Sequence, residues 1–204
     1  MTHDEWVRRA GELPLLASPV GIQALLDGLP YNPGATTRSP ARVLAEGTAN
    51  CMEGALFAAA CLERIGHAPR LVNIVAVRDD DHVLAIFRQA GCYGSLAKSN
   101  YTGLRYRNPV YRTVRELVLS YFEDYFNQLG ELTMRGYTRP LDLRGRRFRG
   151  WQVADDIDYL SDALDAQPQN RVLPAGGETR LRDADALLLR AGLLGSDPAG
   201  LYQL

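Results

Sequence analysis

Cys51 and His82 are the residues of this sequence whose types and positions best suit covalent chemistry. Cys51 follows the loop at 47–50 and opens a segment of alanines and large apolar residues, so we expect it at a helix N-terminus. There the helix dipole and the free backbone N–H groups favour a thiolate and can stabilise an oxyanion. His82 follows three aspartates and opens a β-rich run. The sequence therefore predicts a Cys–His site that attacks a carbonyl carbon.

Each of these residues also has an ordinary structural interpretation. A cysteine within a helix is usually a small buried apolar residue. That interpretation suits Cys61 and Cys92, which lie within an expected helix and an expected strand. His82, taken alone, is typical of a residue that follows a hairpin turn. Cys51 differs because it is terminal in its helix and follows a loop, and the pair is more informative than either residue alone.

The elements that must position this pair can be read from periodicity and turn residues. Asn50 is a suitable N-cap for a buried helix that runs from Cys51 to a terminating Gly66. Three antiparallel strands are expected next, joined by hairpins, at 70–78, 82–88 and 92–97. Further helices are predicted at 20–29, 40–46, 111–127 and 181–194.

These elements predict an α+β fold in which the helix bearing Cys51 packs on a small antiparallel sheet, with other helices around it. The length of 204 residues suits one domain with an appendage. We expect a domain over 1–150 with its core at 47–128, and a C-terminal helical extension over 151–204. Proline, glycine and polar residues predict a flexible loop at 167–178.

The order GTANCMEGALFAAACLERIGHAPRLV, DDDHVLAIF and GCYGSLAKSNY resembles the core of the transglutaminase-like superfamily, which has a papain-like Cys–His arrangement. The resemblance covers roughly residues 47–100, and YRTVRELVLSYFEDYFN is similar to an uncharacterised bacterial subgroup. It implies that Cys51 begins a central helix and that His82 lies on a neighbouring sheet. It also implies an aspartate four positions after an aromatic residue.

This sequence departs from that pattern at the aspartate. Aligning Tyr93 with the aromatic residue puts Ala97 at the acid position, and no Asp or Glu occurs between His82 and Arg115. Asn can orient an imidazole through its amide oxygen, so Asn100 and Ser99 are the candidates for that role. Further candidates, for substrate binding, are Asn50, Tyr93, Arg105 and Lys98, the only lysine in the chain.

Composition limits the classes of partner. The net charge is -1, so no overall positive field attracts nucleic acid, and no apolar run is long enough for a membrane span. The three cysteines lack close pairing, which favours reduced thiols in a cytoplasm. No zinc or calcium motif occurs, and we expect neither a metal nor a cofactor.

We therefore predict a transglutaminase-like thiol enzyme that performs acyl transfer or hydrolysis at an amide or thioester. Its substrate would be a peptide, a protein or a carrier-bound acyl group. Cys51 would attack the carbonyl and His82 would carry the proton. Two alternatives remain open. The chain would be an inactive binding or scaffold protein that has lost the acid, or an anion-binding module that uses Lys98 and the arginines after it.

Overall fold

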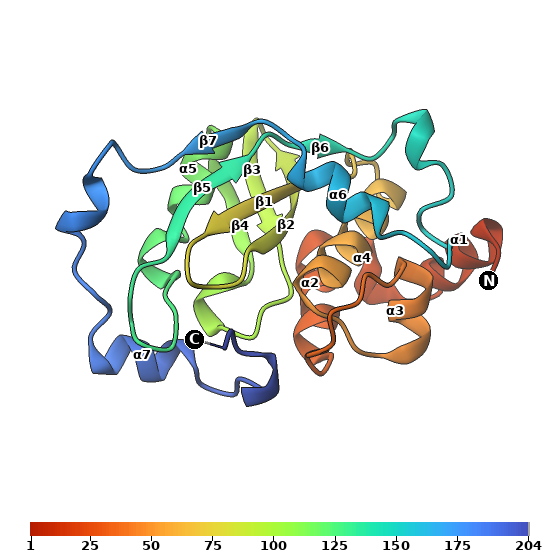
Figure 1. Ribbon diagram of the computed structural model, residues 1–204. Helices are drawn as coiled ribbons and strands as arrows, with labels where there is room; N and C mark the ends of the chain where they lie inside the picture. The colour runs from red at the N-terminus through yellow and green to blue at the C-terminus, as the bar shows by residue number, and fades with distance from the viewer. Residues whose placement is uncertain (204) are drawn as a thin grey trace.

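The computed structural model describes residues 1–203 and has an α+β fold, in which helices cover both faces of one antiparallel sheet (Figure 1). The helices are α1 (His3–Gly11), α2 (Pro19–Gly28), α3 (Pro40–Glu46), α4 (Cys51–Arg64), α5 (Val114–Leu119), α6 (Tyr159–Asp165) and α7 (Ala186–Gly192). The strands are β1 (Arg70–Ala76), β2 (His82–Gln89), β3 (Cys92–Leu96), β4 (Arg107–Tyr111), β5 (Met134–Thr138), β6 (Leu141–Asp142) and β7 (Gln169–Arg171). Short 3-10 helices include η2 (Thr102–Leu104) and η6 (Pro198–Gly200).

The sheet has the strand order β4-β3-β2-β1-β5-β7, and β6 pairs with β1. The hairpins β1–β2 and β2–β3 are the ones expected from the sequence, and their registers place Ile74 opposite His82 and Ala85 opposite Leu96. The short β2–β3 turn puts Ala90 and Gly91 at positive φ, the left-handed conformation that tight hairpin turns need.

Alternation along β2 separates two cores. Val83, Ala85 and Phe87 pack in the core that α1 to α4 and α6 share with one face of the sheet. Leu84 and Ile86 point to the opposite face, which the segment around α5 covers. Because side chains alternate along a strand, His82 belongs to this second face. Figure 1 shows α1 to α4 gathered beside the sheet, with the C-terminal segment running below it.

The sheet-facing helix is α4, whose residues from Met52 to Leu62 are all buried. A helix with no polar face can only be central, as the sequence predicted. Gly54 allows α4 to approach the end of β3, because a Cβ there would lie 2.3 Å from the Cβ of Lys98. The close packing of α4 on the sheet thus places Cys51 at one end of the strands.

The single helix predicted over 111–127 is wrong. Tyr111 instead ends β4, which pairs with β3, and Thr113 caps the six-residue helix α5 by accepting a hydrogen bond from the Glu116 N–H. Phe126 then forms a bridge with Leu132. The apolar positions of the predicted helix are nonetheless buried, including Leu117, Val118, Tyr121 and Tyr125. Helical spacing therefore identified the buried residues, while strand pairing and the cap decided the conformation.

The C-terminal part of the chain contributes to the cores and to the sheet. Residues of α6 pack in the first core, and β7 pairs with β5 as the last strand of the sheet. The segment predicted as a flexible loop at 167–178 therefore contains a strand. The last helix is shorter than predicted, because Asp185 caps it and starts it at Ala186. Among residues 1–203, no helix is long and apolar enough to cross a bilayer.

Candidate active site

Cys51 is the first residue of α4, and the start of this helix is fixed by a capping box. The Asn50 side chain accepts a hydrogen bond from the Glu53 N–H at 2.9 Å, and the Glu53 carboxylate accepts one from the Asn50 N–H at 3.0 Å. This arrangement leaves the N–H groups of Cys51 and Met52 without helical partners, as at any helix N-terminus. Two N–H donors therefore stand beside the thiol.

Glu53 also fastens the loop at 31–38 to the start of α4. Its carboxylate is completely buried and accepts hydrogen bonds from Asn32 Nδ2 at 3.0 Å and Thr36 Oγ1 at 2.6 Å. It accepts another from the Arg38 N–H at 3.1 Å, and Arg38 Nε lies 3.6 Å away as an ion pair. Asn50 Nδ2 adds a bond to the Thr36 carbonyl at 2.8 Å. The amide of Asn50, predicted to bind substrate, is thus occupied by the protein itself.

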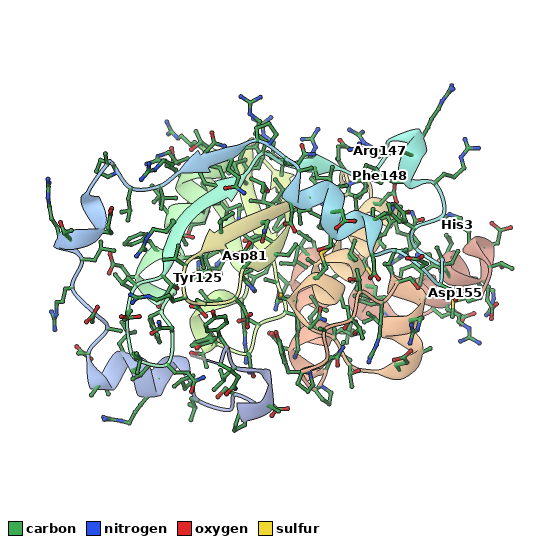
Figure 2. All side chains as sticks on the ribbon, in the orientation of Figure 1. His3, Asp81, Tyr125, Arg147, Phe148 and Asp155 are labelled. Carbon is green, nitrogen blue, oxygen red and sulfur yellow. The ribbon has the colours of Figure 1, made fainter. Side chains whose placement is uncertain are left out.

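Cys51 and His82 line one pocket of about 330 Å³ at the end of the sheet. The loop at 31–35 forms one wall, the turn between β1 and β2 forms a second, and the C-terminal residues 199–201 form a third. The remaining lining residues are Asn50, Met52, Ser99, Asn100, Tyr101, Leu104 and Tyr125. Figure 2 shows Asp81 and Tyr125 at this end of the sheet, away from His3 and Asp155.

The His82 imidazole is held by a main-chain carbonyl. Its Nε2 lies 2.8 Å from the Leu104 carbonyl oxygen, and because a carbonyl only accepts, Nε2 carries the proton. Nδ1 has no hydrogen-bond partner among residues 1–203 and presents its lone pair. The ring also makes edge contacts with Tyr121 and Tyr125, with centroids 6.5 Å away in each case. The Leu104 carbonyl thus fixes the tautomer and orientation of the ring, the role that an acid or amide side chain has in other Cys–His sites.

Both members of the pair are neutral at rest. Burial lowers the pKa of His82 to about 4; the bond to the Leu104 carbonyl opposes this shift, and the charge of Arg107 adds to it. Burial raises the pKa of Cys51 to about 11, and the negative charge of Asp80 adds to that effect. Backbone N–H groups at Val83, Met52 and Cys51 lower it, but by less than burial raises it. Desolvation therefore opposes the resting thiolate that the helix N-terminus was expected to favour.

The thiol and the imidazole are not hydrogen bonded to each other among the described residues. Cys51 Sγ lies 3.8 Å from the Asp81 carbonyl oxygen, while His82 faces the second core. Catalytic hydrogen bonds are often long without substrate and tighten when it binds. The pocket brings the two residues together as wall neighbours, and a proton transfer between them requires closer approach.

The expectation that Asn100 or Ser99 orients His82 is wrong. Ser99 Oγ accepts a hydrogen bond from the Tyr101 N–H at 3.0 Å. The Asn100 side chain donates to the Asp197 carbonyl at 2.8 Å and accepts from the Asp197 N–H at 2.7 Å. Both residues line the pocket, but Asn100 anchors the C-terminal segment there. Their side chains therefore shape the wall and leave the imidazole to the main chain of η2.

Lys98, Arg105 and Tyr93 do not line the pocket that holds Cys51. Lys98 is buried, and its Nζ donates to the carbonyls of Leu26 and Leu29 at the end of α2. Burial lowers its pKa. It lines a neighbouring pocket of about 360 Å³ with Arg105, whose guanidinium lies 3.8 Å from Asp27. Tyr93 lies on β3 beneath the Arg88 guanidinium, which is 5.4 Å from its ring centre.

Sequence reasoning missed several lining groups. The Leu104 carbonyl could not be found, because a main-chain atom has no signature in side-chain type. Tyr31 and Tyr101 come from loops whose course depends on tertiary contacts. Asp79 and Asp80 lie in the turn that precedes β2, and both reach the pocket. Their position directly before His82 was the one available signal.

Comparisons with known proteins leave the family of this chain open. No protein-family model matches the sequence, and no curated protein matches it at a significant level. The arrangement described above is therefore the basis for a functional assignment.

Proposed function

We propose that this protein is a transglutaminase-like thiol enzyme that transfers or hydrolyses an acyl group from an amide or thioester. The observation that carries the proposal is the pocket that Cys51 and His82 share. One residue stands at a capped helix N-terminus, and the other has a fixed tautomer with a free Nδ1. This combination provides a nucleophile, a base and two N–H donors within one cavity.

In the proposed reaction, Cys51 Sγ attacks the carbonyl carbon while His82 Nδ1 takes the thiol proton. The electron pair of the carbonyl π bond moves to oxygen, and the N–H groups of Cys51 and Met52 stabilise that oxyanion. When the tetrahedral intermediate collapses, the bond to the leaving amine or thiol breaks, and the imidazolium returns the proton to the leaving group. Water or a second nucleophile then attacks the thioester on Cys51 by the same sequence of steps.

The neutral resting pair determines how this reaction begins. An imidazole with a pKa of about 4 is a weak base for a thiol with a pKa of about 11. A separate ion pair is therefore strongly disfavoured, and proton transfer must accompany attack on the carbonyl. Without substrate, the Cys51 thiol is protonated and unreactive. Substrate binding must therefore make proton transfer from the thiol to His82 more favourable.

An inactive binding protein is the second candidate, and one observation favours it. The acid position of the family is occupied by Ala97, which is completely buried, and the thiol and imidazole share no hydrogen bond in the described part of the chain. In that case the pocket would bind a ligand without forming a covalent bond. Retention of both Cys51 and His82 in one pocket favours the enzyme.

We further propose a cytoplasmic location and an acyl substrate carried by a peptide, a protein or a carrier. The three free cysteines are consistent with a reducing compartment. The pocket is large enough for a side chain or a short acyl group, with the rest of the substrate outside.

Acylation by p-nitrophenyl acetate, followed by peptide mass spectrometry, tests the enzyme against the binding protein. The enzyme should carry one acetyl group on Cys51 and release it with turnover. The Cys51→Ala variant should show no acetylation at residue 51 and no turnover. Cys92→Ala is the matched control, since Cys92 is a partly exposed thiol outside the pocket. Acetylation of Cys92 in preference to Cys51 would favour the binding protein.

A further inference from the structure

The turn between β1 and β2 brings three carboxylates to the pocket wall, and these carboxylates differ in the hydrogen bonds that they accept. Asp81 accepts hydrogen bonds from the Ala76 N–H at 2.9 Å and from Asn73 Nδ2 at 2.8 Å. Asp79 accepts from Thr133 Oγ1 at 2.7 Å and from the Asp80 N–H at 3.0 Å. The Asp80 carboxylate has no hydrogen-bond or ion-pair partner among residues 1–203. One carboxylate is thus free to bind a ligand.

Tyr101 supplies an independent sign of a missing partner. Its side chain is only 9% exposed and lines the same pocket, yet its hydroxyl makes no hydrogen bond within the described chain. A buried polar group without a partner costs free energy, and such groups in native structures call for an explanation. Tyr101 lines the same pocket as Asp79 and Asp80, and burial and the charges of these two carboxylates raise its pKa.

The rest of the wall suits a cation. The lining includes Asp79, Asp80 and Asp81 but no arginine or lysine of the described chain. The rings of Tyr31, Tyr101 and Tyr125 offer aromatic surface, which attracts ammonium groups. A bound metal ion is a poorer fit, since no group of three metal-binding side chains occurs among residues 1–203.

We propose that this pocket binds a protonated primary amine on the acyl donor, held by the Asp80 carboxylate and the Tyr101 hydroxyl oxygen beside Cys51. This inference rests on the proposed function and adds the substrate class: an acyl group with a free ammonium near its scissile carbonyl, such as the amino-terminal residue of a peptide. The ammonium N–H groups donate to the exposed Asp80 carboxylate and to the Tyr101 hydroxyl oxygen, which gives the buried hydroxyl the partner that it lacks.

The chemistry assigns the ammonium to the donor. An attacking amine must be unprotonated, because its lone pair forms the new bond. A site with a free carboxylate and a second acid nearby favours the protonated form, which has no lone pair. The ammonium group therefore serves only to bind the acyl donor in the pocket. The nucleophile of the second step reaches the thioester by another route.

Binding at this site also changes the thiol. The charge of Asp80 contributes to the raised pKa of Cys51. An ammonium that pairs with Asp80 cancels this charge and lowers the thiol pKa when the correct substrate is present. The donor would thus help to activate its own nucleophile.

Calorimetric titration of Cys51→Ser at pH 7 tests the site, with L-alaninamide and N-acetyl-L-alaninamide as the two probes. The first carries an ammonium and the second replaces it by a neutral amide. We expect L-alaninamide to bind about tenfold more tightly or better, since a charge-assisted pair is lost in the other probe. Asp80→Asn should weaken the binding of L-alaninamide by about tenfold, and Tyr101→Phe should weaken it by severalfold, because each variant removes one hydrogen-bond partner of the ammonium group.

The matched control is Asp155→Asn, which removes an exposed carboxylate far from the pocket and should not change binding. Circular dichroism and thermal melting verify that each variant is folded. Equal affinity for the two probes, unchanged affinity in Asp80→Asn, or no binding of L-alaninamide at millimolar concentration would overturn the inference. Because Cys51→Ser lacks the thiol nucleophile, the affinity is measured without the thiol-dependent reaction. L-alaninamide binding without Cys51 acylation in the wild type would retain the amine site and reject the enzyme.

Discussion

Replacement of Glu53 by alanine should strongly lower the free energy of unfolding, because the Glu53 carboxylate holds the start of α4 and the loop at 31–38 together. The buried carboxylate accepts four hydrogen bonds, from Asn50 N, Asn32 Nδ2, Thr36 Oγ1 and Arg38 N. Removing the acceptor leaves three partly or fully buried donors unpaired, on Asn50, Asn32 and Arg38, at about 1 kcal/mol each, while the hydroxyl of the exposed Thr36 can bond to water. The sum of about 3 kcal/mol agrees with the 3–5 kcal/mol that is typical when one partner of a buried charge pair is removed.

Urea unfolding at neutral pH measures this loss, with Glu46→Ala as the matched control. Glu46 also pairs with Arg38, at 2.8 Å, and with Arg42, at 2.7 Å, but it is partly exposed. Its removal should cost no more than about 1 kcal/mol. Hydrogen exchange should accelerate in the loop at 31–38 only for Glu53→Ala. A loss below about 1 kcal/mol for Glu53→Ala, or one equal to that of the control, would refute the role assigned to this network.

Three further predictions concern pH, packing and the C-terminal segment. Because burial lowers the pKa of His82 from 6.5 to about 4, its contribution to stability is complete above pH 6.5 and is lost as pH falls to 4. The stability of the wild type relative to His82→Asn should fall by about 3 kcal/mol over that range in urea unfolding, and a constant difference would contradict the assignment. Gly54→Ala should destabilise by about 2 kcal/mol or more through contact with Lys98, whereas Gly28→Ala, which meets no atom within 4 Å, should not destabilise. Asn100→Ala removes both bonds to Asp197, so amide exchange at 197–202 should accelerate; unchanged exchange would show that other contacts hold the segment.

Local signals carried most of the fold prediction. Asn50 and Glu53 form a capping box within four residues, so the local sequence is sufficient to predict where α4 begins. The hairpins around β2 follow from short turns between apolar runs. The helix predicted over 111–127 failed because pairing of Tyr111 with Tyr93 depends on a distant strand. One long helix and a short helix followed by loops would bury the same residues. The sequence pattern alone therefore does not distinguish these two conformations.

The site was predicted in part. Position in the chain was enough to bring Cys51 and His82 to one pocket, because a helix start and a strand start meet at the same end of the sheet. The protonation states could not be predicted, since desolvation depends on every wall of the pocket. The roles of Ser99 and Asn100 were misjudged for a related reason. Asn100 meets Asp197, which lies 97 positions away along the chain.

The rate of Cys51 acetylation as a function of pH tests most directly whether His82 is the base. Peptide mass spectrometry after timed reaction with p-nitrophenyl acetate gives this rate for the wild type and for His82→Ala. If the neutral imidazole assists attack, the wild-type rate rises with the ionisation of His82 near pH 4 and then stays level through neutral pH. The His82→Ala rate should instead follow the thiolate and climb steadily towards pH 11. Superimposable profiles that both climb with the thiolate would contradict the account.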